Sequence, residues 1–424
     1  MKNTPADEAG ALPGRLEERA PGRWELYSKS AESWERVSTP EGSRLAWRRE
    51  EGWAARAWED DGPRFAAATS PGELLAALAD ARRFAPETEP PPTWPNGAAE
   101  PASATPAERP PELFEALGRA LTDATNGACT LSRLALRQGT LVERVRNAGG
   151  LDVGQTRSEL DGVATAIARR GERASEVRIA FRSFEGPDIP ALARRLGDAA
   201  TLPLAEPAAP PTRGEWLLDP VVGAALLAGI APIFTSERPP RWIARGALAA
   251  PDTGVADDAT PDALFDGEGV PSRRVLLVEE GQLVGGLRDL RAAQRRGLPS
   301  TGHGVRPSYR TPPAAGPRRI FFETKTPRTP AELLASVKRG VYASALISPP
   351  RIDVVEDRFE IEFAGIAVLA GRARGPIPAA RVAGRLSELL RRIQALSTDL
   401  QFFPLPFAAG APTILIEPAS FEQA

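Results

Sequence analysis

The chain has 424 residues, of which 25% are charged and 42% are hydrophobic, an ordinary composition for a soluble globular protein of two or three domains. Its formal net charge of −2 gives no electrostatic reason to expect nucleic acid or an anionic membrane as a partner. The single cysteine excludes an intramolecular disulfide, which is typical of a reducing compartment.

Neither a secretory signal nor a membrane span is expected. The first ten residues are acidic and carry no apolar run. The most apolar stretch, Val221 to Ile233, is too short to cross a bilayer and favours a buried helix. We therefore expect a cytoplasmic protein.

The N-terminal segment, residues 15–85, predicts short strands and one helix. Glu50-Glu51-Gly52 lies between two strand-like runs and is interpreted as a hairpin turn. Ser70 and Glu73 form a capping-box pattern around Pro71, and apolar residues follow at helical spacing. This pattern predicts one α/β unit.

Residues 86–111 are rich in proline and predict a linker without regular structure, because proline removes backbone donors and fixes φ. A flexible or extended connector is the favoured interpretation. The alternative is a loop that reaches a partner, with Trp94 as its anchor.

A second α/β segment is expected over residues 112–205. It begins with an amphipathic helix and contains the alternating strand Val177–Arg182. Asp188 then begins another helix.

The remaining residues, 212–424, predict a strand-rich domain with a few helices. A hairpin is expected around Glu279-Glu280-Gly281, a helix from Thr329 that closes at Gly340, and a late helix from Leu386 to Ile393. Strands with segregated helices define an α+β fold.

One loop carries most of the family information. The run Asp257 to Arg274 contains Phe265-Asp266-Gly267-Glu268-Gly269-Val270-Pro271, which resembles the signature loop of the TldD/TldE (PmbA) proteins. Other pieces resemble the family in the same order along nearly the whole chain: residues 43–70, Gly214–Pro220, Arg273–Gly281, Ser300–His303 and Val382–Leu386. The resemblance implies a strand-rich C-terminal domain of the TldD/PmbA type and a place in a two-subunit metalloprotease.

The catalytic member of that family carries His-Glu-x-x-x-His on the helix after the Gly214–Pro220 strand, together with a downstream cysteine. Two imidazoles on one helix hold zinc, and the glutamate polarises the bound water. Here the corresponding residues, Val221 to Ile230, include no side chain that can ligate a metal. The resemblance therefore implies a TldE/PmbA-like subunit with no catalytic residue, metal ligand or cofactor of its own, and zinc in a TldD-like partner.

Two other groups of residues are candidate sites. The acidic cluster Asp257, Asp258, Asp262, Asp266 and Glu268 has looser spacing than a cation-binding loop. We expect instead that Gly267 and Gly269 permit a tight turn while Asp266 and Glu268 cap backbone amides.

The only histidine, His303, follows Ser300 and Thr301, but adjacent residues seldom form a nucleophile and base pair. We expect a loop histidine, with a general-base role as the less favoured alternative. Cys129 is expected in the core. The N-terminal tryptophans are expected mainly in the core or in strand pairs, with one or two available for a subunit interface.

The leading interpretation is a non-catalytic subunit that pairs with a TldD-like, metal-binding chain and helps enclose a chamber where unfolded or modified peptides are cleaved. The main alternative is a stand-alone homodimeric scaffold or peptide-binding protein that has lost protease function. A third hypothesis is an independent hydrolase that uses carboxylates or His303.

Overall fold

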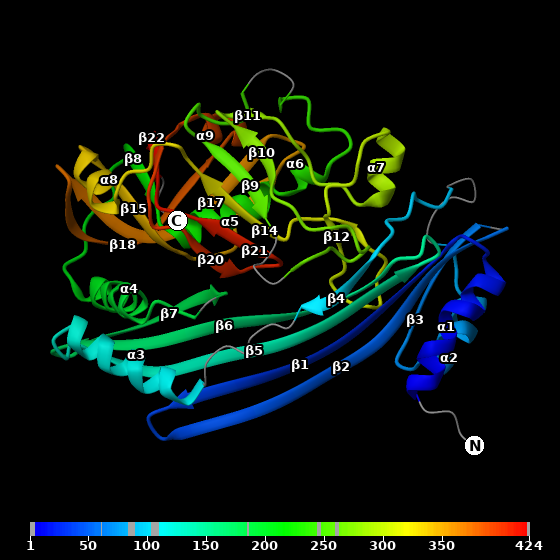
Figure 1. The fold of residues 1–424 in the computed structure, drawn as a ribbon. Helices are drawn as coiled ribbons and strands as arrows, with labels where there is room; N and C mark the ends of the chain where they lie inside the picture. Colours follow the sequence, from blue (N-terminus) through cyan, green and yellow to red (C-terminus); the bar gives the residue numbers. More distant parts are fainter. Residues whose placement is uncertain are drawn as a thin grey trace.

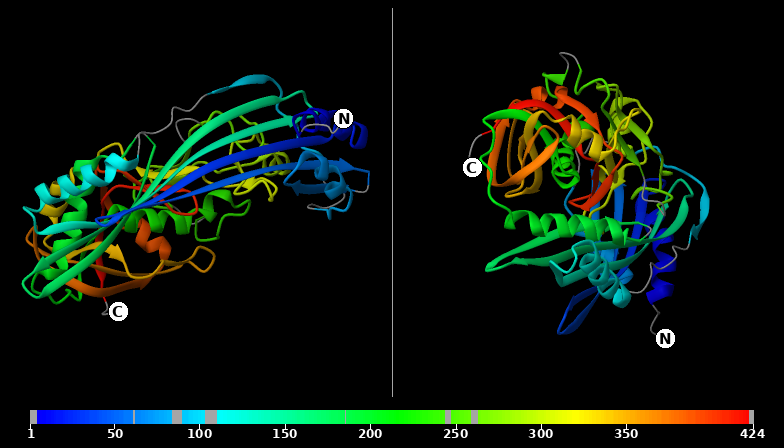
Figure 2. Two further views of the ribbon diagram at one scale, coloured as in Figure 1. Left: turned by 90° about the horizontal axis from the view of Figure 1, so that it is seen from below. Right: turned by 90° about the vertical axis from the view of Figure 1, so that its left-hand side faces the viewer.

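The computed structural model describes residues 5–60, 62–83, 90–102, 110–184, 186–243, 247–258 and 263–421. Strands predominate and helices lie apart from them in the chain, so the expected α+β class is confirmed. A long curved sheet from the N-terminal half lies against the C-terminal half of the chain (Figure 1). Figure 2 shows that its strands run along most of the length of the molecule.

The N-terminal and middle segments share this long sheet, whose order is β3-β2-β1-β5-β6-β4 with β7 paired to β6. All neighbouring strands are antiparallel except β4, which runs parallel to β6. The strands are β1 (Trp24–Thr39), β2 (Gly42–Glu59), β3 (Gly62–Ala68), β4 (Ala98–Ala102), β5 (Cys129–Asn147), β6 (Asp152–Arg170) and β7 (Arg173–Ser183).

Helices cover both ends of one face of the long sheet. At one end α1 (Pro5–Arg19) and α2 (Pro71–Ala79) bury a cluster that includes Leu16, Leu74 and Leu78. At the other end α3 (Pro110–Ala124) and α4 (Ile189–Thr201) pack on Leu134 and Leu136, and the short 3-10 helix Leu202–Leu204 follows. The middle of this face carries no helix in the described part of the chain (Figure 1).

The C-terminal half contains two further sheets and a two-stranded ribbon. One sheet has the order β11-β10-β9-β14-β21-β20, and the other has the order β16-β17-β15-β8-β22-β19 with β18 paired to β17. The strands are β8 (Arg213–Leu218), β9 (Gly254–Asp258), β10 (Val275–Glu279), β11 (Gln282–Leu283), β12 (Gly304–Val305), β13 (Ala314–Ala315), β14 (Arg319–Glu323), β15 (Arg339–Leu346), β16 (Arg351–Asp353), β17 (Arg358–Leu369), β18 (Arg372–Gly384), β19 (Ile393–Leu396), β20 (Gln401–Pro404), β21 (Ala408–Ala411) and β22 (Ile414–Ser420).

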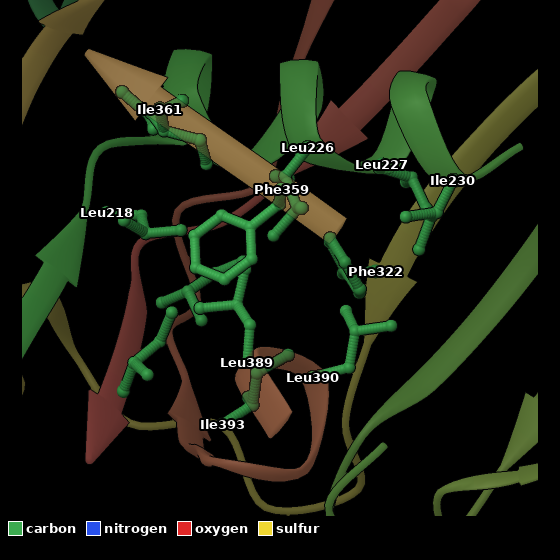
Figure 3. Packing of buried hydrophobic residues seen from close by; sticks show 14 of the residues in the cluster. Leu218, Leu226, Leu227, Ile230, Phe322, Phe359, Ile361, Leu389, Leu390 and Ile393 are labelled. Atoms are coloured by element: carbon green, nitrogen blue, oxygen red, sulfur yellow. The ribbon is translucent and has the colours of Figure 1, made fainter. Parts of the chain in front are cut away.

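The largest core lies around the apolar helix α5 (Pro220–Ile230), which contacts strands of both C-terminal sheets. Figure 3 shows Leu226, Leu227 and Ile230 of this helix near Phe322 and Phe359 from strands and Leu390 from a helix. The remaining helices are short: α6 (Pro232–Thr235), α7 (Leu290–Arg296), α8 (Pro330–Ser336) and α9 (Leu386–Arg391).

The predicted hairpin turn at Glu50-Glu51-Gly52 is wrong. Strand β2 runs through these residues, and the chain turns at Pro40-Glu41. Gly52 is needed in mid-strand because a Cβ there would lie 2.3 Å from the ring of Tyr309. Gly52 therefore leaves room for the Tyr309 ring inside a strand, although the sequence pattern indicated a turn residue.

The expectation of no regular structure over residues 86–111 is also wrong. Within its described part, β4 pairs with β6 and α3 already begins at Pro110. The Trp94 ring packs within the chain, where its centroid lies 5.5 Å from that of Trp58, and its role as an anchor for a partner stays a prediction. The limits proposed for the four segments, 15–85, 86–111, 112–205 and 212–424, remain predictions.

Smaller differences concern helix ends. The Ser70 side chain does not cap α2. Thr329 and Glu332 do form a capping box on α8, but the helix ends at Ser336 rather than near Gly340. Gly340 instead lies in β15, where a Cβ would approach the Glu215 backbone to 2.0 Å. The late helix ends before Ile393, which begins β19.

In the part of the chain that the structure describes, no helix combines the length and the apolar character that a membrane span requires.

Candidate functional site

The signature loop, Phe265–Pro271, lies between β9 and β10 and is held by its own carboxylates. Asp266 accepts the backbone N–H groups of Glu268 at 2.9 Å and Val270 at 3.0 Å with Oδ1, and that of Gly304 at 2.7 Å with Oδ2. Gly269 has φ +79°, which favours glycine. These contacts produce the turn that the sequence pattern predicts.

Glu268 connects this loop to a network of buried ionisable side chains. Its Oε2 accepts the N–H of Leu290 at 2.7 Å, so it caps a second backbone segment. Its Oε1 lies 2.8 Å from Nη2 of Arg56, a residue of β2 whose side chain is fully buried. The loop of the C-terminal half is therefore tied directly to the N-terminal sheet.

Glu25 completes the network on the sheet side. Arg56 also donates to Glu25, with Nη2 2.6 Å and Nε 3.2 Å from the carboxylate oxygens. Arg306 pairs with the same carboxylate and donates from Nε to the carbonyl of Gly267 at 2.7 Å. Two arginines thus alternate with two glutamates in a region closed to solvent.

Opposing effects act on the pKa of Glu268. Burial raises it, the nearby carboxylates of Asp266, Asp289 and Glu25 raise it further, and Arg56 lowers it. The balance places the pKa of Glu268 at about 8. For Arg56 burial lowers the pKa, but Glu25 and Glu268 together raise it above its ordinary value.

A second set of contacts joins the loop to β1, β5 and β6. The Gln155 side chain donates to the carbonyl of Phe265 at 3.1 Å and accepts the N–H groups of Leu264 at 2.9 Å and Phe265 at 3.2 Å. It also donates to Glu143, which accepts the hydroxyl of Tyr27 at 2.7 Å. The side-chain amide of Gln155 therefore both donates to and accepts from the loop backbone, as the backbone of a neighbouring strand would.

His303 lies beside this loop and is almost completely buried. Its Nδ1 is 2.8 Å from the carbonyl oxygen of Thr301 and its Nε2 is 2.9 Å from Oδ1 of Asp257. The hydroxyls of Ser300 and Thr301 both donate to the carbonyl of Arg288. The structure therefore does not bring a hydroxyl nucleophile and the histidine together.

The acidic cluster is dispersed among separate partners. Asp257 accepts the backbone N–H of Arg318 at 3.0 Å in addition to its contact with His303, and Asp258 pairs with Arg319 at 3.2 Å. Asp266 and Glu268 accept backbone amides as described above, while Asp262 lies outside the described residues. Among the described residues no group of three or more His, Cys, Asp or Glu side chains is arranged to hold a metal ion.

Helix α5 occupies the position that the resemblance assigns to the catalytic helix, directly after β8. Asp219 begins it by accepting the N–H of Val221 at 3.0 Å, and also contacts Arg195 at 2.7 Å and the hydroxyl of Tyr342 at 2.7 Å. The helix itself consists of apolar residues and glycine. Gly223 faces Ala411 so closely that a Cβ would lie 2.9 Å from it. These side chains provide packing and do not fit a zinc ion.

Cys129 is buried in the core formed by α3, α4 and the long sheet, as expected. Burial raises the pKa of its thiol. Of the five N-terminal tryptophans, Trp24 and Trp58 are buried, whereas Trp34 and Trp47 are 45% and 49% exposed.

A cavity of about 270 Å³, which the sequence did not predict, lies between the long sheet and Pro404 of the C-terminal half. Glu35, Arg137 and Asp161 line it from β1, β5 and β6, where the strand register places them side by side. Asp161 also pairs with Arg182 of β7 at 2.7 Å. The pairing register of four strands brings these alternating charges into one row. A local sequence pattern therefore cannot predict the row.

The C-terminal half matches a known domain. Residues 243–423 match the model of the PmbA/TldA metallopeptidase C-terminal domain. The chain is 26% identical over 147 residues to the metalloprotease TldD homolog of Haemophilus influenzae, a match covering 34% of this chain and 30% of that protein. It is 31% identical over 195 residues to an uncharacterized protein of Methanocaldococcus jannaschii, covering 43% and 45%. The matched region thus spans less than half the length of these curated relatives.

Solved structures match over nearly the whole chain. TldE from Thermococcus kodakarensis has a TM-score of 0.83 at 18% identity, covering 98% of this chain and 99% of that chain. A putative modulator of a DNA gyrase from Thermotoga maritima has a TM-score of 0.75 at 14% identity, covering 97% and 100%. At these identities the likeness establishes the fold.

The fold and the matched domain together define an α+β protein with a metallopeptidase-type C-terminal domain. Residues 243–423 are thus a domain of the PmbA/TldA metallopeptidase C-terminal family, and the whole chain has the fold of TldE.

Proposed function

We propose that this chain is a non-catalytic TldE/PmbA-like subunit of a cytoplasmic TldD/TldE-type metalloprotease that acts on unfolded or modified peptides. In this complex the chain stabilises the dimer and forms part of the wall of the proteolytic chamber. A TldD-like partner with His-Glu-x-x-x-His carries the zinc ion and supplies the chemistry of amide hydrolysis.

The observation that carries the proposal is the composition of α5. The helix begins at the capped turn after β8, where the family places its metal-binding helix, yet its residues are Pro, Val, Gly, Ala, Leu and Ile. Val222, Ala224, Leu226 and Leu227 are buried in the main core. A helix whose side chains are committed to packing supports an architectural role for this subunit.

The relatives also support this assignment. The names of two relatives identify them as a metalloprotease TldD homolog and as TldE. The tie between the signature loop and the N-terminal sheet, through Glu268, Arg56 and Gln155, supports a rigid frame that can hold a partner in place.

Co-expression tests the proposal. The chain is produced alone, with the nearest TldD-like chain that carries His-Glu-x-x-x-His, and with a variant of that partner whose motif glutamate is replaced by glutamine. We expect co-purification with both partner forms, and cleavage of unfolded peptides only with the intact partner. Cleavage by this chain alone after exhaustive chelation would contradict the non-catalytic role.

The alternative, a stand-alone homodimeric scaffold or peptide-binding protein, gains support from the exposed tryptophan pair on β1 and β2. It predicts a stable homodimer that ignores every TldD-like chain offered. The same co-expression experiment therefore separates the two functions by size-exclusion chromatography.

A further inference from the structure

The cavity beside Pro404 has the size of a site for part of a ligand. One wall is formed by residues of β1, β2, β5 and β6, and the opposite wall by Pro404 at the end of β20. Figure 1 shows β20 on the side of the C-terminal half that is turned toward the long sheet. Its volume of about 270 Å³ is below the roughly 300–1,000 Å³ of pockets that enclose a whole drug-sized ligand. The cavity therefore fits one end or one side chain of a larger molecule.

The cavity lies on the same face of the long sheet as the contacts with the signature loop. Glu25 and Glu35 are ten residues apart on β1, and an even separation places both side chains on one face of a strand. Glu25 contacts Arg306 of the C-terminal half, so Glu35 also points toward that half. A ligand in the cavity would lie between the two halves of the chain.

Two arginines that line this cavity keep their side-chain donors available. Arg137 lies between Glu35 and Asp161 in the strand register. Asp161 is already committed, because its two oxygens accept from the guanidinium of Arg182 at 2.7 and 2.8 Å. Within the described part of the chain, the side chains of Arg48, Arg137 and Glu35 form no hydrogen bond or ion pair. Both arginines can therefore donate to a ligand.

The chemistry of these side chains selects a carboxylate. A guanidinium group presents a planar fork of donors that matches the two oxygens of a carboxylate. Two uncommitted arginines face one uncommitted glutamate, Glu35, so the lining carries a surplus of one positive charge. A phosphate group, at about −1.5 to −2, exceeds that surplus and would be repelled by Glu35.

The remaining lining is apolar and offers little backbone pairing. Ala135 and Val163 can pack against the methylene groups that precede a carboxylate. Pro404 has no N–H and lies on the last strand of its sheet, a position where proline discourages the addition of another strand. Recognition in this cavity therefore depends on side chains.

We infer that the cavity binds a carboxylate of a peptide between Arg48 and Arg137, and that Glu35 restricts the site to a single negative charge. The carboxylate belongs to an acidic side chain or to the C-terminus of the peptide. This inference rests on the proposed function for its ligand class and deepens it, because it assigns a peptide contact to the subunit that has no catalytic role.

Calorimetric titration of the purified full chain tests the ligand. Three unfolded, N-terminally acetylated peptides share one sequence: the first has an internal glutamate and an amidated C-terminus, the second has glutamine there and the same amide, and the third has glutamine and a free C-terminal carboxylate. We expect the first or the third to bind about tenfold more tightly than the second. The tighter of the two identifies the source of the carboxylate. Equal affinity for all three peptides would overturn the inference.

Substitutions with opposite expected signs locate the site. Arg48→Gln and Arg137→Gln should each weaken binding of the preferred peptide about tenfold, whereas Glu35→Gln should tighten it about threefold by removing a repulsion. Arg133→Gln is the matched control, because Arg133 is an exposed arginine of β5 that is not among the residues lining the cavity. A loss in the control as large as that in Arg137→Gln would indicate general attraction to a basic surface and overturn the assignment.

Cleavage by the complex with a TldD-like chain separates this inference from the proposed function. If the complex cleaves none of the peptides while the chain alone keeps its preference for a carboxylate, the proposed function fails and the site stands. If the complex cleaves all three equally and the chain alone shows no preference, the site fails and the proposed function stands.

Discussion

At the scale of single residues, the chain places ionisable groups where water cannot reach them. Glu25, Arg56, Glu268 and Arg306 are each almost fully buried and are joined by direct side-chain contacts. Breaking such a network by removing one partner is costly, because the remaining charge stays buried without compensation. The signature loop is therefore fixed in place by electrostatics that depend on both halves of the chain.

The raised pKa of Glu268 predicts a pH-dependent stability. Its folded-state pKa of about 8 exceeds its unfolded-state value of about 4.3, so between these values the folded chain holds a proton that the unfolded chain releases. Stability should accordingly fall as the pH rises through this interval, by at most about 1.4 kcal/mol per pH unit for one proton. We expect Glu268→Gln to flatten the dependence of Tm on pH between pH 5 and 8 in scanning calorimetry. The exposed Glu115→Gln should keep the wild-type slope, and parallel curves for all three proteins would contradict the assignment.

His303 has a structural role that can be measured. Replacing it with alanine leaves Asp257 and the carbonyl of Thr301 without their ring partner, at a cost of about 1–3 kcal/mol in the free energy of unfolding. Urea unfolding should detect this loss, while peptide cleavage by the complex with a TldD-like chain should remain unchanged per folded molecule. Lost cleavage with unchanged stability would instead favour the general-base alternative.

At the scale of elements, α5 occupies the position that the resemblance assigns to a metal-binding helix, and its side chains provide packing. Its N-terminus is fixed by Asp219, and its side chains fill the space between the two C-terminal sheets (Figure 3). The glycines of the helix have the same role, since Gly223 and Gly229 meet Ala411 and Ile352 at distances too short for a Cβ. A polar or larger side chain on this helix would disturb the main core.

We therefore expect Leu226→Ala to lower the free energy of unfolding by about 2–5 kcal/mol, because the side chain is fully buried and leaves a cavity. Leu369→Ala, at a 45% exposed position of β17, is the matched control and should cost less than about 1 kcal/mol. Chemical denaturation of the two variants tests this. A cost for Leu226→Ala no larger than that of the control would place α5 outside the cooperative core.

At the scale of the whole molecule, the signature loop couples the N-terminal sheet to the C-terminal half. Gln155 makes three hydrogen bonds to backbone atoms of Leu264 and Phe265, and Glu268 reaches Arg56 of β2. These contacts join residues more than one hundred positions apart in the chain. The two halves are thus held in one arrangement by a few side chains.

Gln155→Ala should loosen this coupling. We expect faster hydrogen exchange at the amides of Leu264 and Phe265, which lose their acceptor, with little change in the exchange of α5. Thr140→Ala, at an exposed position of β5, is the control and should leave both regions unaffected. Unchanged protection at Leu264 and Phe265 in the Gln155 variant would show that other contacts hold the loop.

Local signals in the sequence were sufficient for several elements. Alternation identified Val177–Arg182, and Asp188 and Thr329 marked the beginnings of α4 and α8, because these patterns depend only on neighbouring residues. The composition of residues 221–233 indicated a buried apolar helix for the same reason. The turn around Asp266 and Gly269 was also predicted, since short-range hydrogen bonds create it.

The tertiary structure alone decided the rest. Gly52 in mid-strand, Gly340 in β15 and the proline-flanked strand β4 are explained by long-range approaches that no local pattern records. The buried network of Glu25, Arg56, Glu268 and Arg306 and the charge row beside Pro404 depend on strand register and on the docking of distant loops. The sequence by itself determined the α+β class and the turn chemistry of the signature loop, because these depend on local patterning. Which charges become buried together, and which line the cavity beside Pro404, was decided only when the strands paired.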